Sequence, residues 1–102
     1  MQPMELFQRF PILPEKIKKK IDILGKPCVW NIIAILSITD AKTINITSLI
    51  SKLNSNYNYV MRCIELMKSF DMVNEIKMGR VRLIKLNEDN EYVKTILNIL
   101  YK

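Results

Sequence analysis

Residues 55 to 62, in the middle of the chain, bring together side chains that can read nucleic-acid bases. An asparagine amide can form two hydrogen bonds with the edge of adenine, and an arginine guanidinium can do the same with guanine. Both pairs form in the major groove of DNA, so the residues must lie on one exposed face. The candidate base contacts in this stretch are Ser55, Asn56, Asn58, Tyr59 and Arg62.

Two helices joined by a short polar turn are predicted between residues 46 and 73, around these candidates. Apolar residues from Leu49 to Leu53 recur at helical spacing, and Thr47 is a candidate cap for this short first helix. Asn54 tolerates the left-handed conformation that ends many helices. Asn56 can then cap the second helix with its side-chain oxygen. The pattern predicts a helix-turn-helix.

The second helix, predicted over residues 56–70, has two different faces. Its apolar face carries Val60, Cys63, Ile64, Met67 and Phe70. Its polar face carries Asn58, Tyr59, Arg62, Glu65 and Lys68. A helical hairpin with a merely solvated face remains an alternative at this point, because many helices expose polar residues without binding anything.

A β-hairpin is predicted over residues 73–87, directly after these helices. Two apolar-rich runs flank Gly79, one of only two glycines in the chain. A hairpin tip is exposed, so its charges are expected to be free of the core and available to a partner. Glu75 is its single acidic residue, against the cations Lys77, Arg80, Arg82 and Lys85.

With the hairpin added, the sequence resembles the winged helix-turn-helix family of small DNA-binding regulators, of the MarR, ArsR and Lrp-like kind. The resemblance covers roughly residues 28 to 100 and is a pattern of residue types. It implies a mainly α fold with a small β-hairpin wing, in the α+β class. The residues that carry it are Leu49, Leu53, Val60, Ile64, Met67, Met72, Val73, Gly79, Arg80, Leu86 and Asn87.

Two positions depart from the family pattern. Ser55 stands in the turn where family members usually have an apolar residue, and Tyr57 is expected to fill that space instead. Asp71 stands where a glycine often precedes the first wing strand. Asp tolerates the same left-handed backbone geometry, so this change is expected to preserve the fold.

The resemblance implies a sequence-specific transcriptional regulator of double-stranded DNA. Residues 56–70 would form the recognition helix in the major groove, and the wing, 73–87, would lie on the backbone or minor groove. Two alternatives remain: a winged-helix protein interaction module, favoured by Met61 and Leu66, which are expected to face outward, and a sequence-nonspecific nucleoid-associated protein. The expected backbone contacts are Thr47, Lys52, Lys77, Arg80 and Arg82.

The chain is expected to have three parts. Residues 1–26 form an arm and an amphipathic helix that starts at Pro14 and ends at Gly25, residues 27–87 the winged domain, and residues 88–102 a last helix capped by Asn87. The first and last parts carry more apolar residues than a single core-facing side can bury. This excess predicts a homodimer in which these two parts form the interface. Within the amphipathic helix, the expected apolar face is Ile17, Ile21 and Leu24.

Composition restricts the function further. The chain has 102 residues, 49% of them hydrophobic, and a net charge of +6, which suits one basic domain. It has no histidine and no glycine-rich phosphate loop, so we expect neither an enzyme nor a cofactor. With no apparent signal or membrane-spanning run, a cytoplasmic, nucleoid-associated protein is expected. Cys28 and Cys63 are too far apart in sequence to suggest a metal site, and are expected to be reduced unless the source is a hyperthermophile.

Overall fold

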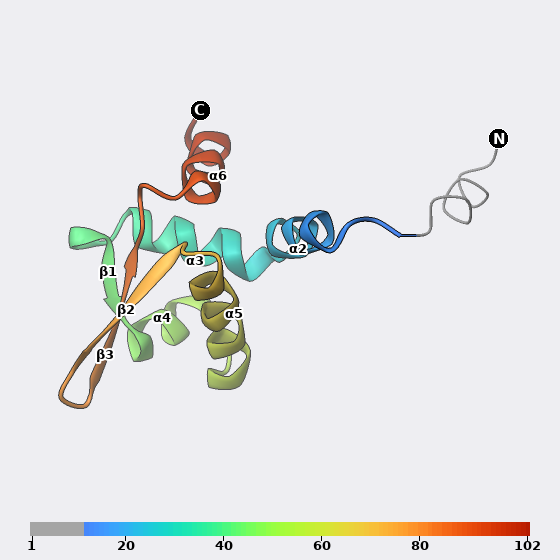
Figure 1. The fold of residues 1–102 in the computed structure, drawn as a ribbon. Helices are drawn as coiled ribbons and strands as arrows, with labels where there is room; N and C mark the ends of the chain where they lie inside the picture. The colour runs from blue at the N-terminus through green and yellow to red at the C-terminus, as the bar shows by residue number, and fades with distance from the viewer. Residues whose placement is uncertain (1–11) are drawn as a thin grey trace.

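The computed structural model describes residues 12–102, and the predicted arm before them lies outside the described residues. The described chain folds into helices and one small sheet, in the α+β winged helix-turn-helix arrangement (Figure 1). Its elements are α2 (Glu15–Leu24), α3 (Pro27–Ser37), a 3-10 turn (Asp40–Lys42), β1 (Thr43–Asn45), α4 (Ile46–Leu53), α5 (Tyr57–Ser69), β2 (Val73–Met78), β3 (Val81–Leu86) and α6 (Glu91–Tyr101).

The three strands form an antiparallel sheet in the order β1-β3-β2. β2 and β3 make the predicted hairpin, and β1 adds a short third strand by pairing Ile44 with Ile84. The hairpin turns at Gly79 and Arg80, and Gly79 has φ 62°, as in a type II′ turn. A side chain at that position would be strained, which explains why a glycine lies at the bend.

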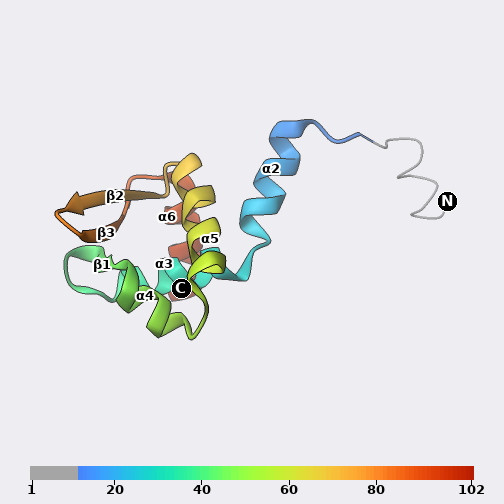
Figure 2. The same ribbon diagram turned by 90° about the horizontal axis from the view of Figure 1, so that it is seen from below.

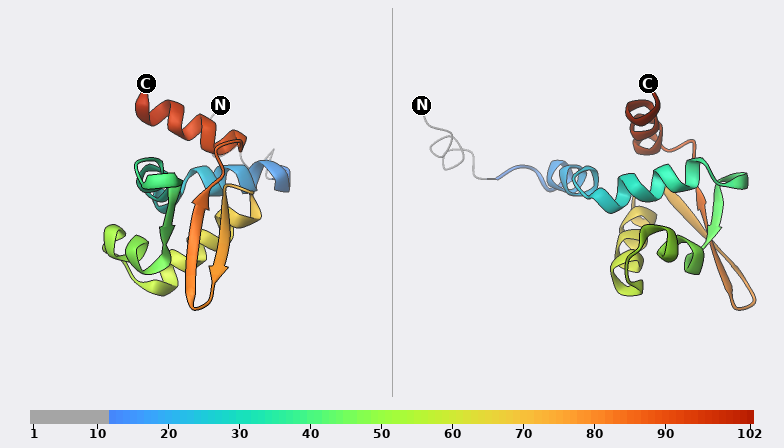
Figure 3. Two further views of the ribbon diagram at one scale, coloured as in Figure 1. Left: turned by 90° about the vertical axis from the view of Figure 1, so that its left-hand side faces the viewer. Right: turned by 180° about the vertical axis from the view of Figure 1, so that it is seen from behind.

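Helix α3 lies at the centre of the core. Ile32, Ile33 and Leu36 on this helix have no solvent exposure. Figure 1 and the right-hand view of Figure 3 show α6 on one side of α3 and the α4–α5 pair with the sheet on the other. The wide apolar surface of α3 is therefore covered on more than one side, as a helix that is apolar on most of its circumference requires.

The helix-turn-helix forms as predicted, except for the cap of its first helix. Asn54 ends α4 in the left-handed conformation, with φ 50° and ψ 48°. Asn56 caps α5, because its Oδ1 accepts a hydrogen bond of 2.9 Å from the amide of Tyr59. The prediction of Thr47 as the α4 cap is wrong: α4 begins at Ile46, and Asn45 Oδ1 accepts from the amide of Ser48 at 2.8 Å.

The cap of the last helix also differs from the prediction. Asn90, rather than Asn87, precedes α6, and its Oδ1 accepts from the amides of Tyr92 and Val93. Asn87 instead forms a local turn, in which its Oδ1 accepts from the Asp89 amide, and its Nδ2 donates to the carbonyl of Asp71. Both residues can cap a helix, and both donate through Nδ2 to a carbonyl near the end of α5, Asn87 to Asp71 and Asn90 to Phe70.

A disulfide links α3 to α5 through Cys28 and Cys63, whose Cα atoms are 6.5 Å apart. Both residues are buried, with 5% and 4% exposure. They do lie on apolar helix faces, as expected. The expectation of reduced thiols, which left a disulfide open only for a hyperthermophile source, is not met, because these two faces meet where α5 crosses the start of α3.

Helix α2 extends away from the rest of the domain (Figure 2). It starts at Glu15, with Pro14 as the preceding cap residue rather than the first helical one, and it ends at Leu24, with Gly25 as the C-cap residue. The indole Nε1 of Trp30 donates to the carbonyl of Leu24 at 2.7 Å and so ties α2 to α3. The predicted apolar face is largely exposed, since Ile17 and Ile21 are 44% and 58% accessible, and Ile23 is the buried residue instead.

Candidate nucleic-acid interface

The outer face of α5 presents three of the predicted base contacts. Asn58, Tyr59 and Arg62 are exposed, whereas Val60 and Ile64 on the opposite face have no solvent exposure. Asn58 and Arg62 are one helical turn apart and line the same shallow hollow. Their amide and guanidinium groups therefore point to one region of space, as a base-reading helix requires.

The two remaining candidates, Ser55 and Asn56, lie at the turn before α5. Ser55 is partly buried, and its amide donates to the carbonyl of Ile50. Asn56 is exposed, but its Oδ1 is held by the Tyr59 amide in the helix cap. The cap bond orients the Asn56 side chain toward its own helix, so the exposed donors and acceptors of this surface come mainly from Asn58, Tyr59 and Arg62.

The disulfide supports α5 from behind this face. Cys28 and Cys63 line a hollow of about 480 Å³ together with Tyr59 and Arg62. The covalent link to α3 is thus made in the same part of α5 that carries two candidate contacts. It restrains the position of these side chains relative to the core.

Three other side chains on α5 differ from expectation. Tyr57 does not fill the turn in place of an apolar residue, because it is 53% exposed and points toward the wing. Met61 and Leu66 do not face fully outward; both are partly buried and pack against the core. Their positions therefore weaken the argument for a protein interaction module that rested on them.

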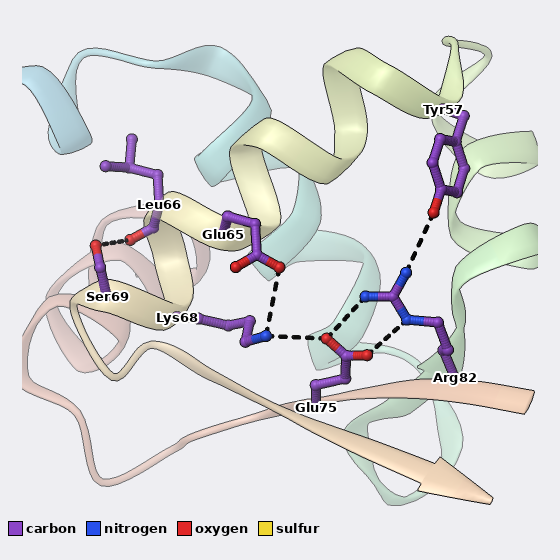
Figure 4. A network of polar contacts seen from close by, with 7 residues as sticks. All are labelled: Tyr57, Glu65, Leu66, Lys68, Ser69, Glu75 and Arg82. Atoms are coloured by element: carbon purple, nitrogen blue, oxygen red, sulfur yellow. Dashed lines mark hydrogen bonds and ion pairs between the residues drawn. The ribbon is translucent and has the colours of Figure 1, made fainter.

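The wing cations are not all free, which corrects the expectation for Arg82. Arg82 Nε donates to Glu75 Oε2 at 2.6 Å, and its Nη2 donates to Glu75 Oε1 at 3.0 Å (Figure 4). Its Nη1 donates to the hydroxyl of Tyr57 at 3.2 Å. Lys68 Nζ approaches the same carboxylate at 3.0 Å and Glu65 at 3.3 Å. The Glu75 side chain is only 6% exposed, so this group is a partly buried ion network.

The network shifts the protonation equilibria of its members. The hydrogen bonds from Arg82, and then those from Lys68, lower the pKa of Glu75 to about 2. The hydrogen bond to Glu75 in turn raises the pKa of Lys68 and that of Arg82. All three groups are therefore charged at neutral pH, and the positive charge of Arg82 is matched by a carboxylate within the protein.

Lys77, Arg80 and Lys85 are exposed wing cations, and within residues 12–102 none of them is paired with a carboxylate. Thr47 and Lys52 are exposed on α4. A groove of about 420 Å³ runs between α4 and the wing and is lined by Thr47, Tyr57 and Arg80, among others. Of the predicted backbone contacts, Thr47, Arg80 and Arg82 thus share one groove, with Arg82 held by Glu75, and Lys52 and Lys77 lie outside its lining.

The outer face of the wing sheet is apolar and exposed. Ile76, Met78 and Val81 are 39%, 63% and 49% accessible, and the register pairs Met78 with Val81. Side chains alternate between the two faces of a sheet. These three residues therefore lie on the face away from Glu75, whose own face is turned toward the core. This surface has no counterpart among the residues that sequence reasoning singled out.

The helix-turn-helix with a hairpin packed beside it defines a winged helix-turn-helix protein. Among solved structures, the chain is similar to the crystal structure of an ArsR family transcriptional regulator. The TM-score is 0.62, the sequences are 17% identical, and the match covers 87% of this chain and 86% of that chain. At this identity the likeness shows the fold. No protein-family model matches the sequence, and no curated protein matches it either.

Two further features of residues 12–102 bear on function. No helix in this range is both long enough and apolar enough to span a membrane. Nor does the range contain three or more cysteine, aspartate or glutamate side chains grouped so that they could hold a metal ion.

Proposed function

We propose that this protein is a transcriptional regulator that binds specific double-stranded DNA through α5 and the wing. The observation that carries the proposal is the division of α5 into a buried apolar face and an exposed face with Asn58, Tyr59 and Arg62. These are side chains that can pair with base edges, and they stand on the second helix of a helix-turn-helix. The net charge of +6 favours a polyanionic partner.

The proposal assigns two roles to the surface. Asn58, Tyr59 and Arg62 contact bases in the major groove, with Ser55 and Asn56 at the margin of the contact. Thr47, Lys52, Lys77 and Arg80 contact the phosphate backbone, which sets the position of α5 and adds affinity without sequence preference. On this view the protein acts in the cytoplasm at the nucleoid and has no enzymatic activity.

A homodimer is part of the proposal, with the first and last parts of the chain at its interface. Ile17 and Ile21 on α2 and Ile99 on α6 are exposed, at 44%, 58% and 63%. Each of the two helices thus exposes apolar side chains on one face. Such faces favour contact with a further protein surface that covers them. A symmetric dimer would present two copies of α5 to two half-sites, which raises both affinity and specificity.

The test is a binding titration at several salt concentrations with two duplexes. One is a fragment from immediately upstream of the protein's own gene, and the other has the same composition in shuffled order. Tighter binding to the upstream fragment supports a specific regulator. Equal binding to both, with a steep salt dependence, would make it a sequence-nonspecific nucleoid protein instead. Absence of binding at low salt would reject the DNA-binding proposal.

A protein interaction module is the second candidate, and the exposed apolar face of the wing favours it. Ile76, Met78 and Val81 resemble the centre of a contact surface more than a phosphate-binding one. Met78→Ser distinguishes the two functions, because it removes apolar area without changing any charge. Unchanged DNA affinity in this variant, combined with a changed mass of complexes in solution, would assign that face to a protein partner.

A further inference from the structure

One side of α5 contacts the wing at both ends of the helix. Tyr57 lies in its first turn and Lys68 in its last, eleven positions apart. At a rise of 1.5 Å per residue, these contacts are about 16 Å apart along the helix axis. Tyr57 reaches the wing through the guanidinium of Arg82, and Lys68 reaches it through the carboxylate of Glu75. Figure 4 shows both contacts converging on the Arg82–Glu75 pair.

The Arg82–Glu75 pair is a rigid connection between the two wing strands. Glu75 lies opposite Ile84 and Arg82 lies opposite Lys77, so Glu75 and Arg82 are diagonal neighbours on the face turned toward α5. The two parallel hydrogen bonds of 2.6 Å and 3.0 Å hold the planar guanidinium in one orientation. The third donor, Nη1, then points to Tyr57.

We propose that Tyr57, Arg82, Glu75 and Lys68 form a positioning network that fixes the wing relative to α5. Arg82 is a positioning residue in this arrangement and does not neutralise a DNA phosphate. The inference rests on the proposed DNA-binding function. Two contacts from opposite ends of α5 that meet at the Arg82–Glu75 pair fix the position of this part of the hairpin along α5 as well as its distance from the helix. Lys77 and Arg80, two of the unpaired wing cations, are then held in place before DNA arrives, which lowers the entropy that binding must overcome to order them.

The charge of the network makes this inference testable. Lys68 and Arg82 carry two positive charges, and Glu65 and Glu75 carry two negative ones, so the network adds nothing to the net charge of the surface. Glu75→Gln removes one negative charge close to the wing. If electrostatic attraction alone mattered, this variant would bind every duplex more tightly. Fixed positioning predicts the opposite sign, because the fork of Arg82 loses its charged acceptor.

The experiment compares Tyr57→Phe, Glu75→Gln and Arg82→Gln with the control Arg80→Gln. The probes are the upstream duplex and its shuffled counterpart. We expect Tyr57→Phe and Glu75→Gln to weaken binding to the upstream duplex about two- to tenfold, the effect of losing one hydrogen bond. The log–log salt slope should stay unchanged in these two variants and in Arg82→Gln. It should become shallower by about 0.9 in Arg80→Gln, which loses a phosphate contact.

A measurement on the free protein tests the network independently of DNA binding. The backbone order parameter of Gly79, from NMR relaxation of the free protein, reports the mobility of the wing tip on the ps–ns timescale. We expect it to fall in Tyr57→Phe and Glu75→Gln and to stay at the wild-type value in Arg80→Gln. Melting temperatures identify any variant that is not folded, and Tyr57→Phe removes only one hydroxyl group.

Two results would overturn the network. The first is an unchanged order parameter at Gly79 in both Tyr57→Phe and Glu75→Gln, whether or not the protein binds DNA. The second is a salt slope in Arg82→Gln that becomes shallower by the same amount as in Arg80→Gln, since Arg82 would then be a phosphate contact. Failure of the wild-type protein to bind either duplex would instead reject the proposed function, and the Gly79 measurement would still decide on the network.

Discussion

The carboxylate of Glu75 lies on the inner face of the wing sheet, opposite fully buried Ile84. A charge in such a place is costly unless it is paired and hydrogen-bonded. Arg82 and Lys68 provide that pairing, and as a result the pKa of Glu75 falls from 4.5 to about 2. The stability of the wing should therefore depend on pH in a range where most surface carboxylates contribute little.

We predict that the network stabilises the native state at neutral pH and loses this effect in acid. Above about pH 4.5, Glu75 is ionised in both the folded and the unfolded chain, and its contribution is complete. Between about pH 4.5 and about pH 2, the unfolded chain takes up a proton that the native state does not, so stability falls with pH. Urea unfolding of the wild type and Glu75→Gln should show a difference in free energy that shrinks over this range. A difference independent of pH would contradict the assignment.

We predict that Arg62 takes part in base recognition. It follows Asn58 by one turn on the exposed face of α5. If Arg62 pairs with a guanine, Arg62→Ala should weaken binding to the preferred site by roughly 1–3 kcal/mol and reduce discrimination at that base pair. Titrations with the specific duplex and with a shuffled one measure both effects. Equal losses on the two duplexes would place Arg62 on the backbone.

For the helices and strands, periodicity and turn residues were enough to predict α2, α4, α5, α6 and the hairpin. The helix ends were harder, because several residue types can act as caps. Thr47 and Asn87 are competent caps in isolation, yet Asn45 and Asn90 take these places. Local sequence does not select between them, and Asn87 and Asn90 both donate to carbonyls near the end of α5.

The ion network around Glu75 could not be predicted from the local sequence pattern either. Glu75 could be recognised as the one acid of the hairpin, but its pairing with Arg82 depends on the register of β2 and β3. A shift of one residue would turn either side chain to the opposite face of the sheet. The role of Tyr57 depends in addition on how the wing packs beside α5. The exposed face with Asn58 and Arg62, in contrast, follows directly from helical periodicity.

We predict that Asn90 stabilises the junction of α5 and α6 in two ways. Its Oδ1 caps α6, and its Nδ2 donates to the carbonyl of Phe70 at 2.8 Å. Asn90→Ala should lower the free energy of unfolding by about 1–2 kcal/mol, since the cap is lost. Asn90→Ser can still cap but cannot reach Phe70, so it should recover part of the loss. Denaturant unfolding of both variants provides the measurement, and equal stability of Asn90→Ala and the wild type would contradict the role of the cap.

At the scale of the whole molecule, the disulfide is the feature that the sequence could not predict. Cys28 and Cys63 are separated by 35 positions, and only the crossing of α3 and α5 brings them together. The spacing contains no information about that crossing, and the composition favoured free thiols. The bond joins the central core helix to the helix with the candidate base contacts, so it connects stability to the geometry of the interface.

We predict that reduction of the disulfide strongly destabilises the domain. Closing a loop of this length restricts the unfolded chain by about 4 kcal/mol in the chain-entropy treatment. Thermal unfolding of the wild type with and without a reductant should show the loss as a lower Tm. The Cys28→Ala/Cys63→Ala double variant is the control, because it should be insensitive to the reductant. A Tm of the wild type that does not respond to the reductant would contradict the prediction.

We predict that the protein forms a homodimer in solution. Exposed apolar residues on α2 and α6 should associate, and light scattering at micromolar concentration should report twice the chain mass of 12.0 kDa. Ile99→Lys places a charge on the exposed face of α6 and should shift the equilibrium toward monomer. Ile99→Leu, which keeps an apolar side chain of the same size at this position, is a matched control that should leave the mass unchanged. A wild-type mass of one chain would exclude the dimer.

The Cys28–Cys63 bond also changes what a cut in the backbone does. It closes the chain from α3 to the middle of α5 into a covalent ring that includes α4 and the turn at Asn54. A protease that cleaves after Lys52 opens the ring without separating the molecule into two pieces, and both helices of the helix-turn-helix stay connected. Cleavage after Arg80 at the wing tip lies outside the ring and severs β3 and α6 from the rest of the covalent chain. A cut within the helix-turn-helix thus leaves the two fragments joined by a covalent bond. After a cut in the wing, only the strand pairing of β3 and the packing of β3 and α6 hold the fragments together.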